Sequence, residues 1–141
     1  VILVGASKSL LESKLGNIID TYDVVCRMNS SGRPDIVNVN NQSIIGVKKN
    51  IWLCKHIANF NLFNNHGYDD IVGFAQISSA SVKMHSNTAQ TASTKGSAII
   101  IECISVLKKF NDYNSIPSCG ILSIFYLLNE YGKIHIWDVG I

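Results

Sequence analysis

The chain has 141 residues, of which 47% are apolar and 16% are charged, and its formal net charge is +2. This length fits one domain, the apolar fraction is sufficient for a packed core, and the low charge excludes an intrinsically disordered chain. The Lys and Arg residues are scattered, which disfavours a nucleic-acid-binding protein, and no apolar stretch reaches the ~20 residues that span a bilayer, so we expect no membrane contact from this segment.

The first half of the chain alternates short apolar runs with polar turns. Residues 1–4 predict a buried strand closed by Gly5, followed by a short helix that begins at Ser9 and ends near Gly16. Residues 23–29 predict a second strand. Two more short strands are expected at residues 51–54 and 71–74.

The second half contains longer helical patterns. Residues 85–96 are polar and fit either a loop near a ligand or a plain surface loop. Residues 97–110 predict a helix, and so do residues 118–131, which are apolar on nearly every side and are expected to be largely buried. Gly132 should end this second helix, before a closing strand at residues 134–137.

Strands that are apolar on both faces and alternate with helices indicate an α/β protein. We expect a Rossmann-like, mostly parallel sheet with helices on both faces, and a central strand 1–4 parallel to its neighbours. Both ends of the chain lie in apolar runs, so we expect it to be cut from a longer domain at both ends.

The turn after the first strand has the form of a phosphate-facing turn. Gly5 allows the backbone to approach a ligand closely, and the N–H groups that follow attract anions. The turn lacks the further glycines of a dinucleotide fingerprint and the Gly-Lys-Ser/Thr of a P-loop. Asp23 opens the second strand instead of ending it, which disfavours nicotinamide and flavin cofactors.

Two segments resemble the large and small sialyl motifs of the sialyltransferases of glycosyltransferase family 29. In the small motif the matching residues are Pro117, Ser118, Gly120 and Leu122, which open the predicted second helix. In the large motif they are Val4, Gly5, Ser7, Leu10, Ser13, Gly16, Ile19, Asp20, Asp23, Val25, Arg27 and Asn29, followed by Gly46 and Lys48.

This resemblance implies an inverting enzyme that transfers sialic acid from CMP-sialic acid to a glycan hydroxyl. It also implies an A-type glycosyltransferase variant with no essential metal or other cofactor, and residues 1–141 would be its nucleotide-sugar-binding part. The family's catalytic base is a His downstream of the small motif, which should lie beyond Ile141, so no catalytic residue is assigned here. The partners would be the nucleotide sugar and the glycan acceptor.

The chain departs from the family pattern at several positions. Ala6 replaces the motif's Asn, a nucleotide contact, and Cys119 replaces the Thr of the small motif. The family's two disulfide-forming cysteines fall on Val1, or just before it, and on Tyr131. Their loss points to a reducing compartment or to a divergent branch, such as a microbial or viral one. The resemblance therefore implies two alternatives for the location: the Golgi membrane if the chain follows the animal family, and the cytoplasm if it is microbial or viral.

The resemblance implies a nucleotide-binding role for Gly5, Ala6, Ser7, Asn29, Ser118, Cys119 and Gly120. An amide such as Asn29 can donate to and accept from a ribose hydroxyl or a phosphate oxygen, although Asn also stabilises turns. Ser7 and Ser118 fit either ligand contacts or helix N-caps, and both turns should line one pocket. Arg27 is expected to pair with Asp20 or Asp23.

Other reactive residue types have simpler interpretations. The four cysteines, Cys26, Cys54, Cys103 and Cys119, lack zinc-site spacing, and most fit buried thiols. His135 is expected to be a packed or edge residue, and His56, His66 and His85 receive no catalytic role. Two alternatives remain: a family 42-like bacterial sialyltransferase, and a non-catalytic nucleotide- or glycan-binding domain, which Ala6 would suit.

Overall fold

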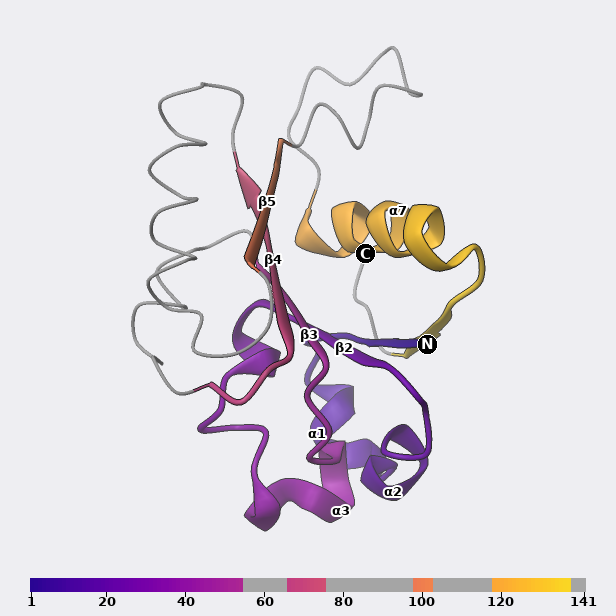
Figure 1. Cartoon of the computed structure of the whole chain (residues 1–141). Coiled ribbons are helices and arrows are strands. Elements are labelled where there is room, and N and C mark those ends of the chain that lie inside the picture. Colours follow the sequence, from indigo (N-terminus) through magenta and orange to yellow (C-terminus); the bar gives the residue numbers. More distant parts are fainter. Residues whose placement is uncertain (55–65, 76–97, 103–117, 138–141) are drawn as a thin grey trace.

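The computed structural model describes residues 1–54, 66–75, 98–102 and 118–137 (Figure 1). Residues 103–110 of the helix expected over residues 97–110, the polar segment 85–96, Cys103, His56 and His85 lie outside these ranges. The described helices are α1 (Ser9–Ser13), α2 (Gly16–Ile19), α3 (Gln42–Ile45) and α7 (Cys119–Tyr131), with two 3-10 turns, η1 (Asn29–Gly32) and η2 (Val39–Asn41). The strands are β1 (Ile2–Val4), β2 (Val25–Met28), β3 (Ile51–Cys54), β4 (Asp70–Ala75), β5 (Ala98–Glu102) and β6 (His135–Trp137).

The described strands form one six-stranded sheet in the order β5-β4-β3-β2-β1-β6. Every neighbouring pair is parallel, and β1 lies between β2 and β6. The prediction of an α/β protein with an internal, parallel first strand is therefore confirmed. The strand order runs outward from β1 to β5 and then returns to β6 on the other side of β1, so the topological switch point lies between β1 and β6.

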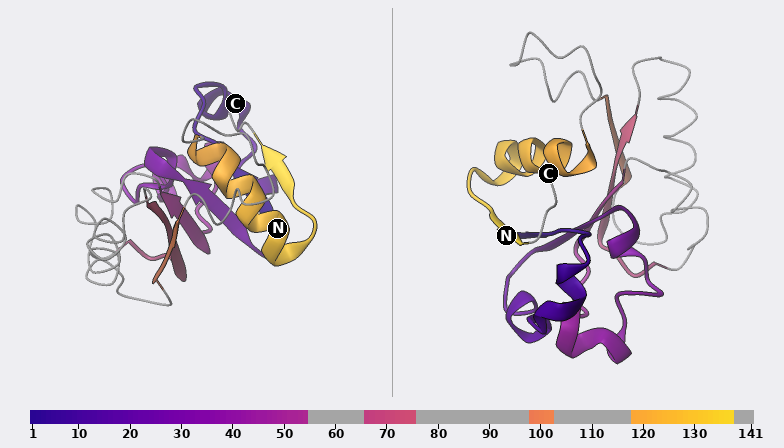
Figure 2. Two further views of the ribbon diagram at one scale, coloured as in Figure 1. Left: turned by 90° about the horizontal axis from the view of Figure 1, so that it is seen from above. Right: turned by 180° about the vertical axis from the view of Figure 1, so that it is seen from behind.

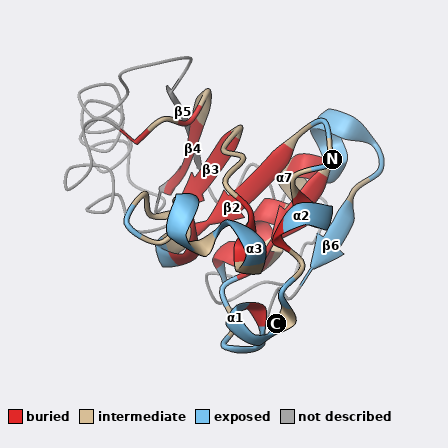
Figure 3. Cartoon of the chain, turned by 90° about the horizontal axis from the view of Figure 1, so that it is seen from below, coloured by how far each residue is buried: buried red, intermediate tan, exposed pale blue. Residues whose placement is uncertain are grey.

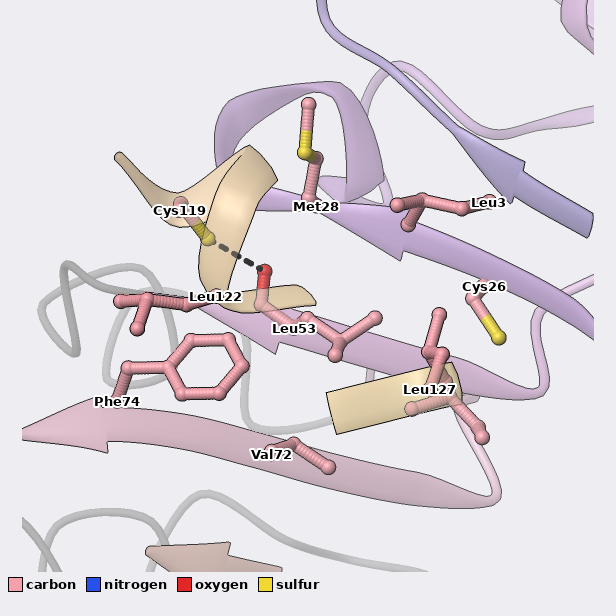
Figure 4. Packing of buried hydrophobic residues seen from close by; sticks show 10 residues of the cluster. Leu3, Cys26, Met28, Leu53, Val72, Phe74, Cys119, Leu122 and Leu127 are labelled. Atoms are coloured by element: carbon pink, nitrogen blue, oxygen red, sulfur yellow. Dashed lines mark hydrogen bonds between the residues drawn. The ribbon is translucent and has the colours of Figure 1, made fainter. Parts of the chain in front are cut away.

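Alternate residues of the strands pack into two hydrophobic cores on opposite faces of the sheet. Figure 3 shows that β2 and β3 are buried, whereas the edge strand β6 is exposed. On one face α7 covers the sheet, and Cys119, Leu122 and Leu127 pack on residues of β1 to β4 (Figure 4). On the other face Leu10 of α1, Ile19 of α2 and Ile45 of α3 pack on Ile2, Val4 and Val25. Helices thus cover both faces, as the apolar pattern of the strands predicts.

The expected helix over residues 97–110 is wrong where the structure describes it, because Ala98–Glu102 form strand β5, parallel to β4. Three consecutive isoleucines, 99–101, favour an extended strand, since β-branched side chains pack well on a pleated surface. The helix α7 is also less buried than expected: its last four residues are exposed, and it buries one side. Gly132 ends it at φ 72°, as predicted.

The first helical segment is shorter than the sequence predicts. It is interrupted after Ser13 by Lys14, whose φ is 52°, and Gly16 begins α2 instead of ending α1. A Cβ on Gly16 would lie 1.8 Å from the carbonyl oxygen of Gln42 and 2.5 Å from the amide nitrogen of Gly46. Only glycine therefore allows α2 to approach the end of α3 this closely.

Candidate nucleotide site at the carboxyl end of the sheet

Gly5, Ala6 and Ser7 follow β1 at the switch point. The amide of Gly5 donates to the carbonyl of Trp137 (2.7 Å), so the β1–β6 pairing continues one residue beyond the strand. Gly5 is buried, Ala6 is exposed and Ser7 is half-buried. This turn therefore begins in the sheet and presents residue 6 to solvent at the carboxyl edge.

Ser7 is not the N-cap of α1, contrary to the simpler interpretation of its hydroxyl. The cap position is Lys8, which makes no side-chain cap bond, and the Ser7 Oγ lies 2.6 Å from the Ser9 Oγ. Because α1 has five residues, it adds little dipole for an anion. Anion attraction at this turn would therefore come from individual amide groups of the loop.

Asn29 follows β2, the strand beside β1. Val4 pairs with Arg27, so the register places Gly5 and Ala6 about level with Met28 and Asn29. Asn29 has a φ of 48°, which is uncommon for a residue other than glycine. Its carbonyl accepts a hydrogen bond from the Trp52 Nε1–H at 2.9 Å. Asn29 thus lies at a sharp turn, two residues beyond the last residue of β2 that pairs with β1.

Ser118, Cys119 and Gly120 open α7 over the neighbouring strands. Ser118 is exposed, and its Oγ accepts from the Ile121 amide at 3.4 Å, so its expected capping role is confirmed. The Cys119 thiol is buried and donates to the Leu53 carbonyl at 3.7 Å (Figure 4). Since Leu53 pairs with Met28, this contact places the start of α7 over the carboxyl-terminal part of β2 and β3.

The three predicted segments therefore lie toward the same end of the sheet, although α1 and α7 cover opposite faces of it (Figure 2). Parallel strands bring their carboxyl ends to one edge, and open α/β sheets bind ligands at that edge. Convergence of Ser7 and Ser118 on one ligand is possible only across this edge. The shared pocket itself stays a prediction.

The expected ion pair of Arg27 with Asp20 or Asp23 is wrong. Arg27 is fully buried, and its Nε donates to the Lys48 carbonyl at 3.0 Å, while Nη1 and Nη2 have no hydrogen-bond partner within the described ranges. The carboxylate of Asp20 instead accepts from the amides of Val47 and Lys48 at 2.9–3.0 Å. Burial lowers the pKa of Arg27 from its ordinary value, and the negative charge of Asp20 partly opposes that shift.

These contacts explain why the motif-like residues of the first segment occur together. Asp20 holds the loop after α3, Gly46 lets that loop approach Asp20, and Lys48 of the same loop anchors Arg27 and donates through Nζ to the Tyr22 carbonyl. Four of the motif-like positions, Asp20, Arg27, Gly46 and Lys48, therefore support β2 and the loop beside it. Sequence reasoning missed this role, since the partners are 21 to 28 residues apart.

A cluster of aromatic residues below the end of β2 was also missed. Trp52 and Tyr68 are fully buried and stack with ring centroids 5.2 Å apart, and His66 lies against both. The Tyr68 hydroxyl donates to the Gly32 carbonyl at 2.6 Å, and burial raises the pKa of Tyr68 well above its usual range. Only the apolar run at residues 51–54 hinted at Trp52, and no sequence signal singled out Tyr68.

The cysteines and histidines of the described residues are either buried or lie at the edge of the sheet. Cys26 is a buried free thiol, and burial raises its pKa to about 12, while Cys54 and Cys119 are also buried. His135 is exposed on the edge strand β6, where its Nδ1 lies 2.6 Å from the Tyr22 hydroxyl, so its expected edge position is confirmed. His66 is buried and accepts from the Tyr68 amide through Nδ1.

Two kinds of feature are absent from residues 1–54, 66–75, 98–102 and 118–137. No cluster of three or more His, Cys, Asp or Glu side chains able to hold a metal ion occurs there. None of the helices found in those ranges has the length and apolar character needed to cross a bilayer.

The chain has the fold of an α/β protein with a parallel sheet and helices on both faces. No protein-family model, curated protein or solved structure matches it.

Proposed function

We propose that this chain is the nucleotide-sugar-binding part of a sialyltransferase, with an A-type glycosyltransferase fold that holds CMP-sialic acid at the carboxyl end of its sheet. The observation that carries the proposal is the location of the Gly5–Ser7 turn. It lies at the β1/β6 switch point, where ligands bind in open parallel sheets. Asn29 and the start of α7 lie at the same end of the sheet.

The ends of the motif-like segments provide a second argument. In the resembled family a disulfide joins positions that fall on or just before Val1 and on Tyr131. Val1 packs against the core cluster that contains Leu127 of α7, and its carbonyl accepts from the His135 amide at 2.9 Å. Position 1 therefore lies in the same region of the fold as the carboxyl-terminal part of α7, which is compatible with such a pairing.

The proposed site would bind its ligand mainly by hydrogen bonding. Amides of residues 5–7 and of the α7 N-terminus would face the phosphate and the sialyl carboxylate, and the Asn29 amide would contact the ribose or phosphate. The 13-residue α7 carries the larger helix dipole, so its start is the better anion site of the two helix starts. Transfer would follow by attack of the acceptor hydroxyl opposite the departing CMP, with a base from outside residues 1–141.

Isothermal titration of the full chain with CMP tests the proposal. CMP should bind more tightly than AMP or NAD, and EDTA should leave the affinity unchanged. Asn29→Ala should weaken CMP binding about tenfold, the equivalent of one good hydrogen bond. Asn17→Ala, at an exposed residue of α2, is the matched control and should have no effect. Equal affinity for CMP and AMP, or tighter binding of NAD, would contradict the proposal.

Ala6 distinguishes an enzyme-like site from a derived binding domain. It is exposed, so Ala6→Asn can introduce the amide of the family motif without displacing core residues. The added donor should strengthen CMP binding by ~0.5–1.5 kcal/mol, or about two- to tenfold. If the substitution leaves a measurable CMP affinity unchanged, the pocket has been rebuilt, as in a non-catalytic domain with another ligand.

A further inference from the structure

Two buried aromatic side chains hold the two ends of the turn that Asn29 opens. This turn, η1, follows β2 directly and ends at Gly32. The Trp52 Nε1–H donates to the Asn29 carbonyl at 2.9 Å, and the Tyr68 hydroxyl donates to the Gly32 carbonyl at 2.6 Å. The first carbonyl of η1 is therefore bonded to a side chain of β3, and its last carbonyl is bonded to a side chain of the segment before β4.

The two aromatic donors act as one unit because their rings stack at 5.2 Å with an interplanar angle of 21°. The turn is packed tightly against them: a Cβ on Gly32 would lie 2.5 Å from Cδ1 and Nε1 of Trp52 and 3.0 Å from the Tyr68 hydroxyl. Both rings are fully buried, so neither has room to follow the turn if it moves. The position of η1 is thus fixed by a rigid support.

The contacts of η1 also fix the backbone conformation of Asn29. Its left-handed φ of 48° is a conformation that Asn tolerates better than most residues but does not prefer. The Trp52 bond orients the peptide group after Asn29, and the Ser31 Oγ, which donates to the Met28 carbonyl at 2.7 Å, orients the peptide group before it. The backbone on both sides of Asn29 is therefore held.

We infer that Trp52 and Tyr68 are positioning residues that set the direction of the Asn29 side chain toward the nucleotide, without touching the ligand themselves. This inference rests on the proposed function, because it assigns Asn29 to the ribose or phosphate of CMP. It goes beyond the motif resemblance, since neither aromatic residue belongs to the motif-like positions. The competing explanation is that Trp52 and Tyr68 only stabilise the core and have no effect on ligand binding.

A double-mutant cycle with CMP as the probe separates these explanations. Trp52→Phe and Tyr68→Phe each remove one donor and keep an aromatic ring in the stack. Each should raise the Kd for CMP about three- to tenfold in the full chain, the fold-change expected for one displaced hydrogen bond. In the Asn29→Ala background both effects should vanish, because the positioned group is absent. Tyr126→Phe, in the half-buried part of α7, is the matched control and should leave Kd unchanged.

Unfolding in urea and backbone NMR of the same variants complete the test. A loss of stability with an unchanged Kd, or an equal loss of affinity in the Asn29→Ala background, would overturn the positioning role. If the parent chain does not bind CMP, the proposed function fails. The part of the inference that concerns the conformation of Asn29 is then tested by NMR of the chain without ligand. Trp52→Phe should still move the Asn29 Cα and Cβ shifts and its HN–Hα coupling away from left-handed values, and unchanged values would overturn it.

Discussion

Replacing Gly46 by alanine should be among the most destabilising single substitutions in the described part of the chain. Gly46 has a φ of 74° and a ψ of 174°, a region that is essentially restricted to glycine and costs other residues ~1–3 kcal/mol. A Cβ there would lie 2.4 Å from the Asp20 Oδ1. The carboxylate must therefore move, and its bonds to the amides of Val47 and Lys48 lengthen or break.

The expected cost is the sum of these two effects. Hydrogen bonds to a charged group contribute ~1.5–3 kcal/mol each, and partial loss of two of them adds about 2–3 kcal/mol to the backbone strain. The free energy of unfolding should then fall by roughly 3–6 kcal/mol, out of the ~5–15 kcal/mol typical of a domain. Urea unfolding followed by circular dichroism measures this change.

Gly132→Ala provides the matched control. Gly132 has nearly the same φ, 72°, but nothing lies within 4 Å of a Cβ added there. This substitution should cost only the strain of a left-handed alanine, about 1–2 kcal/mol. If Gly46→Ala costs no more than Gly132→Ala, the contact between the loop and Asp20 does not support the fold, and the structural explanation of the motif-like residues is wrong.

Three further predictions concern single side chains. Ser118→Ala should lower the free energy of unfolding by ~0.5–1 kcal/mol, which is the low end for an N-cap because the capping bond is 3.4 Å long. Ser118→Asp should retain stability, and equal unfolding midpoints for the parent chain and both variants would exclude the capping role. Burial raises the pKa of Cys26 in the folded chain from 9.0 to about 12. The unfolded chain therefore loses this proton first, so the free energy of unfolding should fall as pH rises from 9 toward 12, by at most ~1.4 kcal/mol per pH unit from this group. Cys26→Ala should reduce this dependence on pH. For the same reason a thiol reagent at pH 8 should modify Cys26 only after unfolding, and rapid labelling of the native chain at this residue would refute its burial.

The sheet was largely predictable because its strands are short and apolar on both faces. Residues 51–54 form β3 as expected, β1 begins one residue later than the expected strand at residues 1–4, and β4 is one residue longer at each end than the expected strand at residues 71–74. The segment 97–102 was assigned to a helix because short apolar runs do not distinguish helix from strand by periodicity. The decisive fact there is parallel pairing with β4, a tertiary contact.

The candidate site was predictable only where local sequence positions it. Gly5 and Ser118 occur at a strand end and a helix start, so their placement follows from the neighbouring residues. The supports of Asn29 come from Trp52, 23 residues away, and Tyr68, whose hydroxyl bonds Gly32 from 36 residues away. Arg27 was expected to pair with a carboxylate, but the carboxylate of Asp20, whose charge acts on Arg27, accepts hydrogen bonds from the amides of Val47 and Lys48 instead.

Mapping of CMP binding by amide chemical shifts tests the central claim most directly. On addition of CMP in EDTA, the amides of Gly5 to Ser7, Asn29 and Ser118 to Gly120 should shift together with one Kd, because the proposed ligand would span the carboxyl edge between β1, β2 and the start of α7. Amides of the amino-terminal edge, such as Val24 and Lys133, should not move. Shifts confined to only one of the three segments, or centred on the opposite edge, would contradict a CMP-sialic acid site at this end of the sheet.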